Sequence, residues 1–185
     1  MDRGTENYRR FRDTGDENAV AEIIKDYREG LIMYLMNIVS DIHTAEDLAE
    51  DTFVLLFTRK PRDKGKGSFK TWLYTIGRNL AIDWLRKQSR HAEVPLEEAA
   101  EISTEDDIVC SELIHEERKI MLYHSMAKLP HDYRQVLYLR YFEELENKEI
   151  AKIMRKSVRS IESLLLRARK QVKELLLKGG FQYEE

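Results

Sequence analysis

The stretch that most constrains the fold runs over residues 65–90, where a basic, glycine-punctuated loop leads into an aromatic segment. Apolar side chains recur along one stripe of this segment, which predicts an amphipathic helix with one buried face. Ser68 suits the N-cap, because its oxygen can accept from a free backbone N–H of the first turn. The stripe consists of Phe69, Trp72, Leu73, Ile76, Leu80 and Trp84. We expect both tryptophans to pack in the core rather than stack on bases.

The other side of this predicted helix is polar and mostly cationic. Its residues are Arg78, Asn79, Asp83, Arg86, Lys87, Gln88 and Arg90. The preceding loop adds Arg59, Lys60, Arg62, Lys64, Lys66 and Lys70 against Asp63. A surface helix with solvated charges would show the same pattern, so this segment alone does not decide a function.

Charge is segregated along the chain, which the formal net charge of −3 conceals. Residues 59–90 hold ten Lys and Arg against two acids, and residues 147–178 hold ten against three. Residues 92–117 hold ten acids and neither Lys nor Arg. Two basic blocks around an acidic one indicate two polyanion-binding surfaces on either side of a connector. We expect residues 92–112 to be a mobile linker.

Scarce glycine, three prolines and periodic Leu, Ile and Ala favour an all-α fold. We expect residues 1–16 to be ragged at the start, and residues 18–39 to form one long helix or two short ones that break near Gly30. Residues 44–47 match a capping box. The helix that follows would bury Leu48 and expose Asp47, Glu50 and Asp51. That acidic face is either ordinary helix electrostatics or a docking ridge for a basic partner.

The C-terminal third has the pattern of a helix-turn-helix reader: a short helix over 147–154 capped by Asn147, a tight turn, and a long basic helix from Val158 to about Lys178. Ser157 would cap the long helix. A plain helical hairpin is the alternative. The face predicted to enter the major groove comprises Arg159, Ser160, Ser163, Leu164 and Arg167, with Arg169, Lys170 and Lys173 placed for phosphates.

Several classes of protein fit poorly. The longest apolar runs are too short to cross a bilayer, and no signal peptide is visible at the start. The single cysteine, Cys110, fits a reducing cytoplasm. The five histidines have no metal-like spacing, and no P-loop, zincin or nucleophile motif appears. We therefore expect no enzyme activity, catalytic residues, metal or cofactor.

Three motifs, in order and covering nearly the whole chain, resemble those of bacterial sigma-70-type initiation factors of the compact extracytoplasmic-function group. Residues 45–53, AEDLAEDTF, are similar to the family's region 2.2. Residues 69–87, FKTWLYTIGRNLAIDWLRK, are similar to regions 2.3 and 2.4. Residues 129–170 are similar to region 4.

The resemblance implies two small helical domains, residues 1–91 and 113–185, joined by the acidic linker 92–112. It implies that core RNA polymerase, through its β′ and β subunits, and promoter DNA are partners. An anti-sigma factor is a further expected partner. We expect no direct insertion of this chain into a membrane. The residues implied to bind the polymerase core are Asp47, Leu48, Glu50 and Asp51. Those implied to read and open the −10 element are Lys64, Lys66, Lys70, Arg78, Asn79, Asp83, Arg86 and Lys87. Those implied to read the −35 element are Lys148, Ser157, Arg159, Ser160, Glu162, Ser163, Leu164, Arg167 and Lys170.

The recognition helix departs from the family pattern at two positions. Glu162 stands where many members have a base, and Leu164 where many have an arginine. Glu162 could accept from a cytosine amino group and Leu164 could touch a thymine methyl, or either could face a protein partner. A stand-alone helix-turn-helix regulator is the alternative function, although the motifs over 45–87 speak against it.

Overall fold

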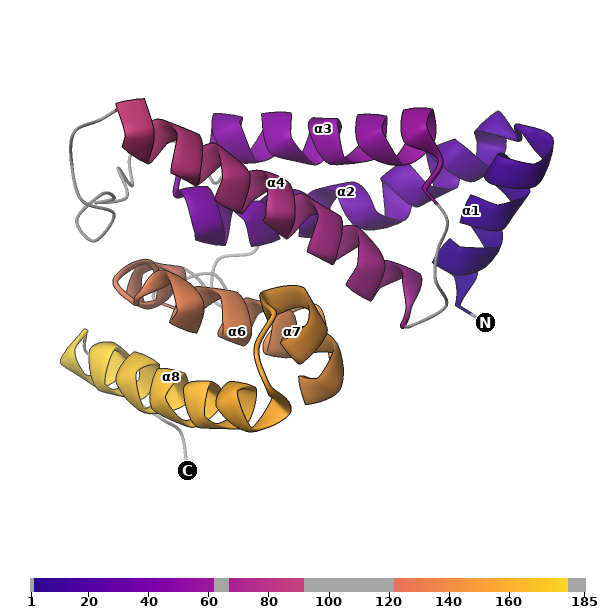
Figure 1. Cartoon of the computed structure of the whole chain (residues 1–185). Helices are drawn as coiled ribbons and strands as arrows, with labels where there is room; N and C mark the ends of the chain where they lie inside the picture. Colours follow the sequence, from indigo (N-terminus) through magenta and orange to yellow (C-terminus); the bar gives the residue numbers. More distant parts are fainter. Residues whose placement is uncertain (1, 62–66, 92–121, 180–185) are drawn as a thin grey trace, which may run out of the picture.

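The computed structural model describes residues 2–61, 67–91 and 122–179, and every regular element in these ranges is helical (Figure 1). The prediction of an all-α fold is therefore confirmed for the described residues. The proposed linker, residues 92–112, lies outside them. The elements are α1 Arg3–Thr14, α2 Glu17–Val39, α3 Ile42–Arg59, α4 Phe69–His91, a short helix over 122–127, α6 His131–Tyr141, α7 Asn147–Met154 and α8 Val158–Lys178.

Helices α1–α4 form the first module, in which α2 packs against the other three. Leu31, Leu35 and Ile38 of α2 are fully buried or nearly so, as is Leu73 of α4. Trp72 and Trp84 are partly buried against this core, as the sequence predicted. The α4 stripe is therefore the attachment face of that helix, and its polar side is left for other contacts.

α1 is an element that the sequence analysis missed, because residues 1–16 were expected to be ragged at the start. Asp2 caps the helix by accepting from the Thr5 backbone N–H at 2.9 Å. Gly15 ends it with a left-handed φ of 75°, which glycine adopts without steric cost. The ring of Tyr8 meets that of Trp72 edge-on with centroids 5.0 Å apart. The helix is thus held by caps and by aromatic packing against α4.

α2 is a single helix that continues through Gly30, so the break considered there does not occur. A Cβ built on Gly30 would lie 2.5 Å from Oε1 of Glu143 and 2.6 Å from the hydroxyl of Tyr74. Only a residue without a side chain fits between these two groups. Gly30 therefore serves close packing rather than a bend.

The predicted caps are partly confirmed. Oγ of Ser68 accepts from the Thr71 N–H at 3.2 Å, and Oγ of Ser157 accepts from the Ser160 N–H at 3.1 Å. The other two predictions were wrong by a few residues. α3 begins one turn earlier than the predicted box, with Asp41 as N-cap, and α7 has Glu146 rather than Asn147 at that position.

Residues 122–179 form the second module, in which α8 packs across α6 and α7. Leu139, Ile150, Ile153, Ile161 and Ala168 are completely buried at its centre. Arg155 ends α7 with a left-handed φ of 53°, and α8 starts three residues later. Short helix, tight turn and long helix are therefore present as predicted.

The two modules pack against each other, which the sequence analysis did not predict. α7 lies against α4 and α6 lies against α2, with α8 on the far side of the second module (Figure 1). One contact across this boundary joins Tyr34 of α2 to Tyr138 of α6, whose ring centroids lie 6.3 Å apart. We call this the closed arrangement.

Candidate polymerase and nucleic-acid interface

The acidic ridge of α3 is exposed. Asp47, Glu50 and Asp51 all face solvent, and the Glu50 side chain is 67% accessible with Arg28 3.8 Å away. Leu48 is only 6% exposed. It lies on the buried stripe with Ala45 and Ala49, as the sequence predicted, and its place among the docking residues stays a prediction. What remains is three carboxylates on one open helix face.

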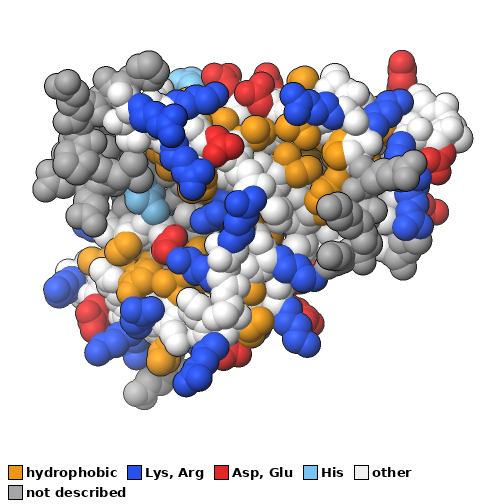
Figure 2. Space-filling view, viewed as in Figure 1, with side chains coloured by type: hydrophobic (Ala, Val, Ile, Leu, Met, Phe, Trp, Pro, Cys, Tyr) orange, Lys and Arg blue, Asp and Glu red, His pale blue; other side chains and the backbone are white. Residues whose placement is uncertain are grey.

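The polar side of α4 is open toward its C-terminal half. Asp83 and Arg86 are 61% and 67% exposed and form an ion pair at 3.3 Å, and Lys87 is exposed beside them. Asn79 is half-buried. Figure 2 shows Lys and Arg side chains gathering over this part of α4 and again along α8. The predicted face therefore exists as one continuous polar surface.

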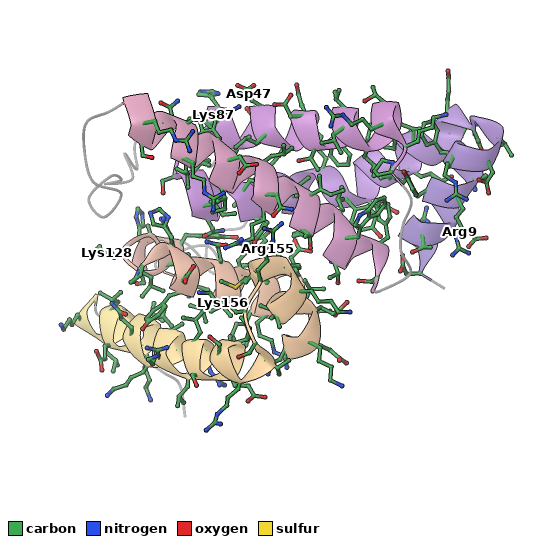
Figure 3. All side chains as sticks on the ribbon, viewed as in Figure 1. Arg9, Asp47, Lys87, Lys128, Arg155 and Lys156 are labelled. Carbon is green, nitrogen blue, oxygen red and sulfur yellow. The ribbon has the colours of Figure 1, made fainter. Side chains whose placement is uncertain are left out.

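A cleft separates this α4 face from the second module. It is lined by Arg78, Asn79, Ile82, Asp83 and Arg86 of α4 and by Arg155 of the turn between α7 and α8. Figure 3 labels Arg155 on the side of the second module that is nearer to α4. Arg78 donates from Nε to Oε1 of Gln135 at 3.2 Å, so one of the predicted DNA-binding residues is engaged by α6. The closed arrangement thus covers one edge of the α4 surface and leaves Asp83 and Arg86 free to meet a ligand.

The first turn of α4 is more completely covered. Nζ of Lys70 lies 2.6 Å from Oε2 of Glu143, and the Lys70 side chain is 32% exposed. Oε1 of Glu149 accepts from the hydroxyls of Ser68 and Thr71 at 2.8 and 2.9 Å. Lys64 and Lys66, predicted to belong to the same surface, lie outside the described residues.

The helix-turn-helix presents its predicted face to solvent. Exposed members are Lys148, Ser157, Arg159, Ser160, Glu162, Ser163, Arg167 and Lys170. Leu164 is 6% exposed and its placement on that face was wrong. It lies three residues after Ile161, which puts both on the inward stripe of the helix. Apolar side chains of α8 that do face solvent include Leu166, at 66% exposed, as well as Val158 and Leu177.

Within the described residues, no group of three or more His, Cys, Asp or Glu side chains is arranged to hold a metal ion. Over the same ranges, no helix is both long and apolar enough to cross a bilayer.

Three residues at the module boundary were not singled out by the sequence analysis: Gln135, Glu143 and Glu149. Gln135 is 2% exposed although it is polar, and it meets both Arg78 and Tyr34. In the sequence, these three polar residues look like ordinary solvent-exposed residues of a helical module. Since each finds its partner in the first module, about sixty to eighty residues earlier in the chain, no local pattern could have identified them.

Comparison with known proteins agrees with this architecture. The family model for sigma-70 region 2 matches residues 23–91, and that for sigma-70 region 4 matches residues 119–172. The ECF RNA polymerase sigma factor SigM of Bacillus subtilis is 34% identical over 161 residues, which cover 86% of this chain and 96% of SigM. The RNA polymerase sigma factor YlaC of the same organism is 30% identical over 171 residues, covering 88% of this chain and 94% of YlaC.

Solved structures show the same fold at low sequence identity. RpoE of Bartonella quintana, in complex with the anti-sigma factor NepR, aligns with a TM-score of 0.66 and 22% identity, covering 84% of this chain and 95% of RpoE. CnrH, in complex with the cytosolic domain of CnrY, aligns with a TM-score of 0.62 and 19% identity, covering 94% of each chain.

The region 2 match spans the acidic ridge and α4, neither of which a stand-alone helix-turn-helix regulator would need. This chain contains both region 2 and region 4. It also matches YlaC and SigM over almost their whole length. The protein therefore belongs to the sigma-70 family, in the extracytoplasmic-function group of promoter-recognising RNA polymerase sigma factors.

Proposed function

We propose that α3 docks this sigma factor on the β′ subunit of core RNA polymerase through Asp47, Glu50 and Asp51. These carboxylates are exposed on one face, while the opposite face of α3 is buried. An ordered row of acids suits a basic partner surface, and complementary charge speeds docking as well as fixing its register. In this proposal, residues 1–91 form the domain that docks on core polymerase and opens the −10 element.

The exposed polar side of α4 would then meet the −10 element. Asn79, Asp83, Arg86 and Lys87 offer donors and acceptors for unpaired bases and for phosphates. Holding a base out of the stack costs a few kcal/mol, which hydrogen bonds and charge contacts from this face would have to offset. Lys70, Arg78 and the loop lysines Lys64 and Lys66 would add sequence-independent attraction to the strand.

The second module, residues 113–185 with 92–112 as its linker, would read the −35 element with α8 in the major groove. Its exposed row of Arg159, Ser160, Glu162, Ser163 and Arg167 faces away from α6 and α7. Region 4 would also contact the β subunit. We further infer that the protein works in the cytoplasm, where polymerase and promoter are, and that it binds an anti-sigma factor. Catalysis would belong to the polymerase alone.

The observation that carries this proposal is the coexistence, on one small module, of an exposed acidic helix face and an exposed basic and polar one. The test is a permanganate footprint of core polymerase with this chain on genomic promoters. Asn79→Ala with Arg86→Ala should reduce the reactivity of unpaired thymines around −10 while affinity for core polymerase persists. Loss of core affinity instead would show that the two surfaces are misassigned.

A further inference from the structure

A carboxylate of the second module occupies the N-terminus of α4. Oε1 of Glu149 accepts from Ser68 and Thr71, while its Oε2 accepts from the backbone N–H of Glu146 at 3.1 Å. Both hydroxyls lie at the N-terminal end of the 23-residue α4, where the positive end of the helix dipole favours an anion. Glu149 thus caps its own helix, α7, and at the same time accepts hydrogen bonds from side chains at the start of α4.

A second carboxylate holds the lysine next to this turn. Glu143 is 8% exposed at its side chain, pairs with Lys70 through Oε2, and accepts from the Tyr138 hydroxyl through Oε1 at 3.2 Å. Lys70 also lies 3.4 Å from the Glu143 carbonyl oxygen. Because Glu143 is largely removed from water, its ion pair is screened less than a surface pair would be.

The electrostatics of Glu149 agree with this geometry. Burial alone would raise the pKa of its carboxyl, but hydrogen bonds, above all the one from Ser68, hold that pKa below the ordinary value. The group is therefore an anion at neutral pH, and it is held as an anion by donors of the other module.

The same boundary contains a feature that opposes closure. Arg134 is 3% exposed, and its Nε has no hydrogen-bond partner within the described residues. Its described contacts are Oγ of Ser40 at 3.0 Å and Nδ1 of His131 at 2.6 Å, and no carboxylate is among them. Burying a guanidinium without an acid is costly. The closed arrangement thus combines specific anion contacts with a penalty that opening would relieve.

We propose that Glu143 and Glu149 form a carboxylate latch that holds the second module on the first turn of α4, at the position where backbone phosphates of a nucleic-acid strand would bind. The latch and the strand then compete for Lys70, Ser68 and Thr71. The competition between the latch and a nucleic-acid strand rests on the proposed function, since Lys70 belongs to the surface assigned to the opened promoter. The closure of the two modules by the two carboxylates does not depend on promoter binding.

The closure can be measured on the full chain by energy transfer between dyes. In a Cys110→Ser background, cysteines replace the exposed Ala21 of α2 and Lys178 of α8, one on each module. Glu143→Gln with Glu149→Gln should lower the ratio of high-transfer to low-transfer molecules about tenfold, the change that 1.4 kcal/mol produces. Glutamine can still make the capping box of α7, so that helix should persist. Glu144→Gln with Glu174→Gln removes the same charge from exposed positions and should leave the ratio unchanged.

A charge swap separates the ion pair from general loss of folding. Lys70→Glu should open the chain by opposing Glu143, and Lys70→Glu with Glu143→Lys should close it again. Unchanged transfer in the glutamine double variant, or no recovery in the swap, would overturn the latch whatever the promoter assays show.

The competition is tested with a short oligothymidine strand as the probe. Adding it to the wild-type chain should increase the low-transfer population, and the increase should weaken as salt rises. Transfer that stays constant at saturating probe would overturn the competition while leaving the latch intact. A wild-type chain with a single low-transfer population would overturn both. Failure of the −10 proposal alone would appear differently, as normal opening by the probe without promoter melting.

Discussion

Oδ2 of Asp2 accepts a hydrogen bond from the backbone N–H of Phe69 at 3.1 Å, so the second residue of the chain caps the start of α4 as well as its own helix. Burial alone would raise the pKa of Asp2, but hydrogen bonds from Thr5 and Phe69 lower it below its ordinary value. The carboxylate therefore stabilises the module at neutral pH, and this stabilisation is lost as pH falls through the lowered pKa.

We expect Asp2→Ala to destabilise the first module by about 1–2 kcal/mol, the range for loss of a helix cap. The urea midpoint monitored by tryptophan fluorescence reports this, because Trp72 packs on Tyr8 of α1. Asp13→Ala, at an exposed position in the same helix, is the matched control. Equal midpoints for the two variants would mean that the Asp2 contacts contribute nothing.

Gly30→Ala should favour the open form without removing any charge. The new Cβ would lie 2.5 Å from Oε1 of Glu143, so that carboxylate must move and its contact with Lys70 weakens. Alanine also raises the helix stability of α2 by about 0.5–1 kcal/mol. We therefore expect a larger radius of gyration by X-ray scattering together with undiminished helicity. Glu29→Ala, exposed and adjacent, is the control, and a radius unchanged in both would contradict the tight fit at Gly30.

The α4 stripe, the helix-turn-helix and the acidic ridge could be predicted because each depends on periodicity within one segment. Leu164 was misplaced, since it is apolar and lies at the border between the exposed and the buried stripe of α8. The closed arrangement could not be predicted, because Glu143 and Glu149 meet their partners only through tertiary contacts. α1 was missed for a related reason: it is stabilised by Asp2 and by aromatic contacts rather than by an apolar repeat.

Charge reversal of Asp47, Glu50 and Asp51 to lysine should abolish binding to core polymerase and leave the fold intact. The three side chains are exposed, so their replacement opens no cavity. Surface ion pairs contribute little singly, but reversal places like charges opposite each other across the interface, which costs several kcal/mol. Binding to core polymerase can be followed by fluorescence anisotropy of a labelled chain.

The matched control for this reversal replaces Glu6, Asp13 and Glu17, three exposed acids on α1 and α2, with lysine. It makes the same change in net charge, so a loss of affinity there would indicate a general charge effect. Core affinity retained by the α3 variant would refute the docking ridge.

Acidic pH should destabilise the folded second module through His131. Partial burial, followed by the neighbouring guanidinium of Arg134, lowers the pKa of this imidazole below its ordinary value. Asp132 on the same helix and the backbone of Asn37 on α2 oppose the shift without reversing it. The unfolded chain then binds more protons at this group than the folded chain, so the free energy of unfolding decreases as pH falls through the ordinary histidine range.

The urea midpoint measured between about pH 7.5 and pH 5.5 should show this loss of stability, on either side of the ordinary histidine pKa of about 6.5. Glu149 does not account for it, because its lowered pKa keeps that carboxyl ionised over this range. His131→Gln retains an acceptor for Arg134 but does not titrate, and it should flatten the profile. His124→Gln, at an exposed position of the same module, should leave the profile as it is. A pH dependence that survives in His131→Gln would assign it to another group.

Lys170 and Ser163 lie on the exposed side of α8 and should affect DNA binding differently. Lys170, placed for a phosphate, offers charge without base information, so Lys170→Ala should weaken all duplexes alike and reduce the salt slope of log K by about 1. Ser163, nearer the N-terminal end that enters the groove, can donate to or accept from a base edge. Ser163→Ala should cost about 0.5–1.5 kcal/mol, the range for one neutral hydrogen bond, at one base pair of the −35 element and leave the salt slope unchanged.

Holoenzyme binding to promoter duplexes mutated singly across −35, at several salt concentrations, separates these two effects. Lys128→Ala removes a charge from an exposed position outside the helix-turn-helix and should change neither quantity. If Lys170→Ala altered the base preference at one position, that lysine would be reading sequence. If Ser163→Ala weakened every duplex equally, the helix would sit differently in the groove, with its N-terminal turn on the phosphates rather than on the bases.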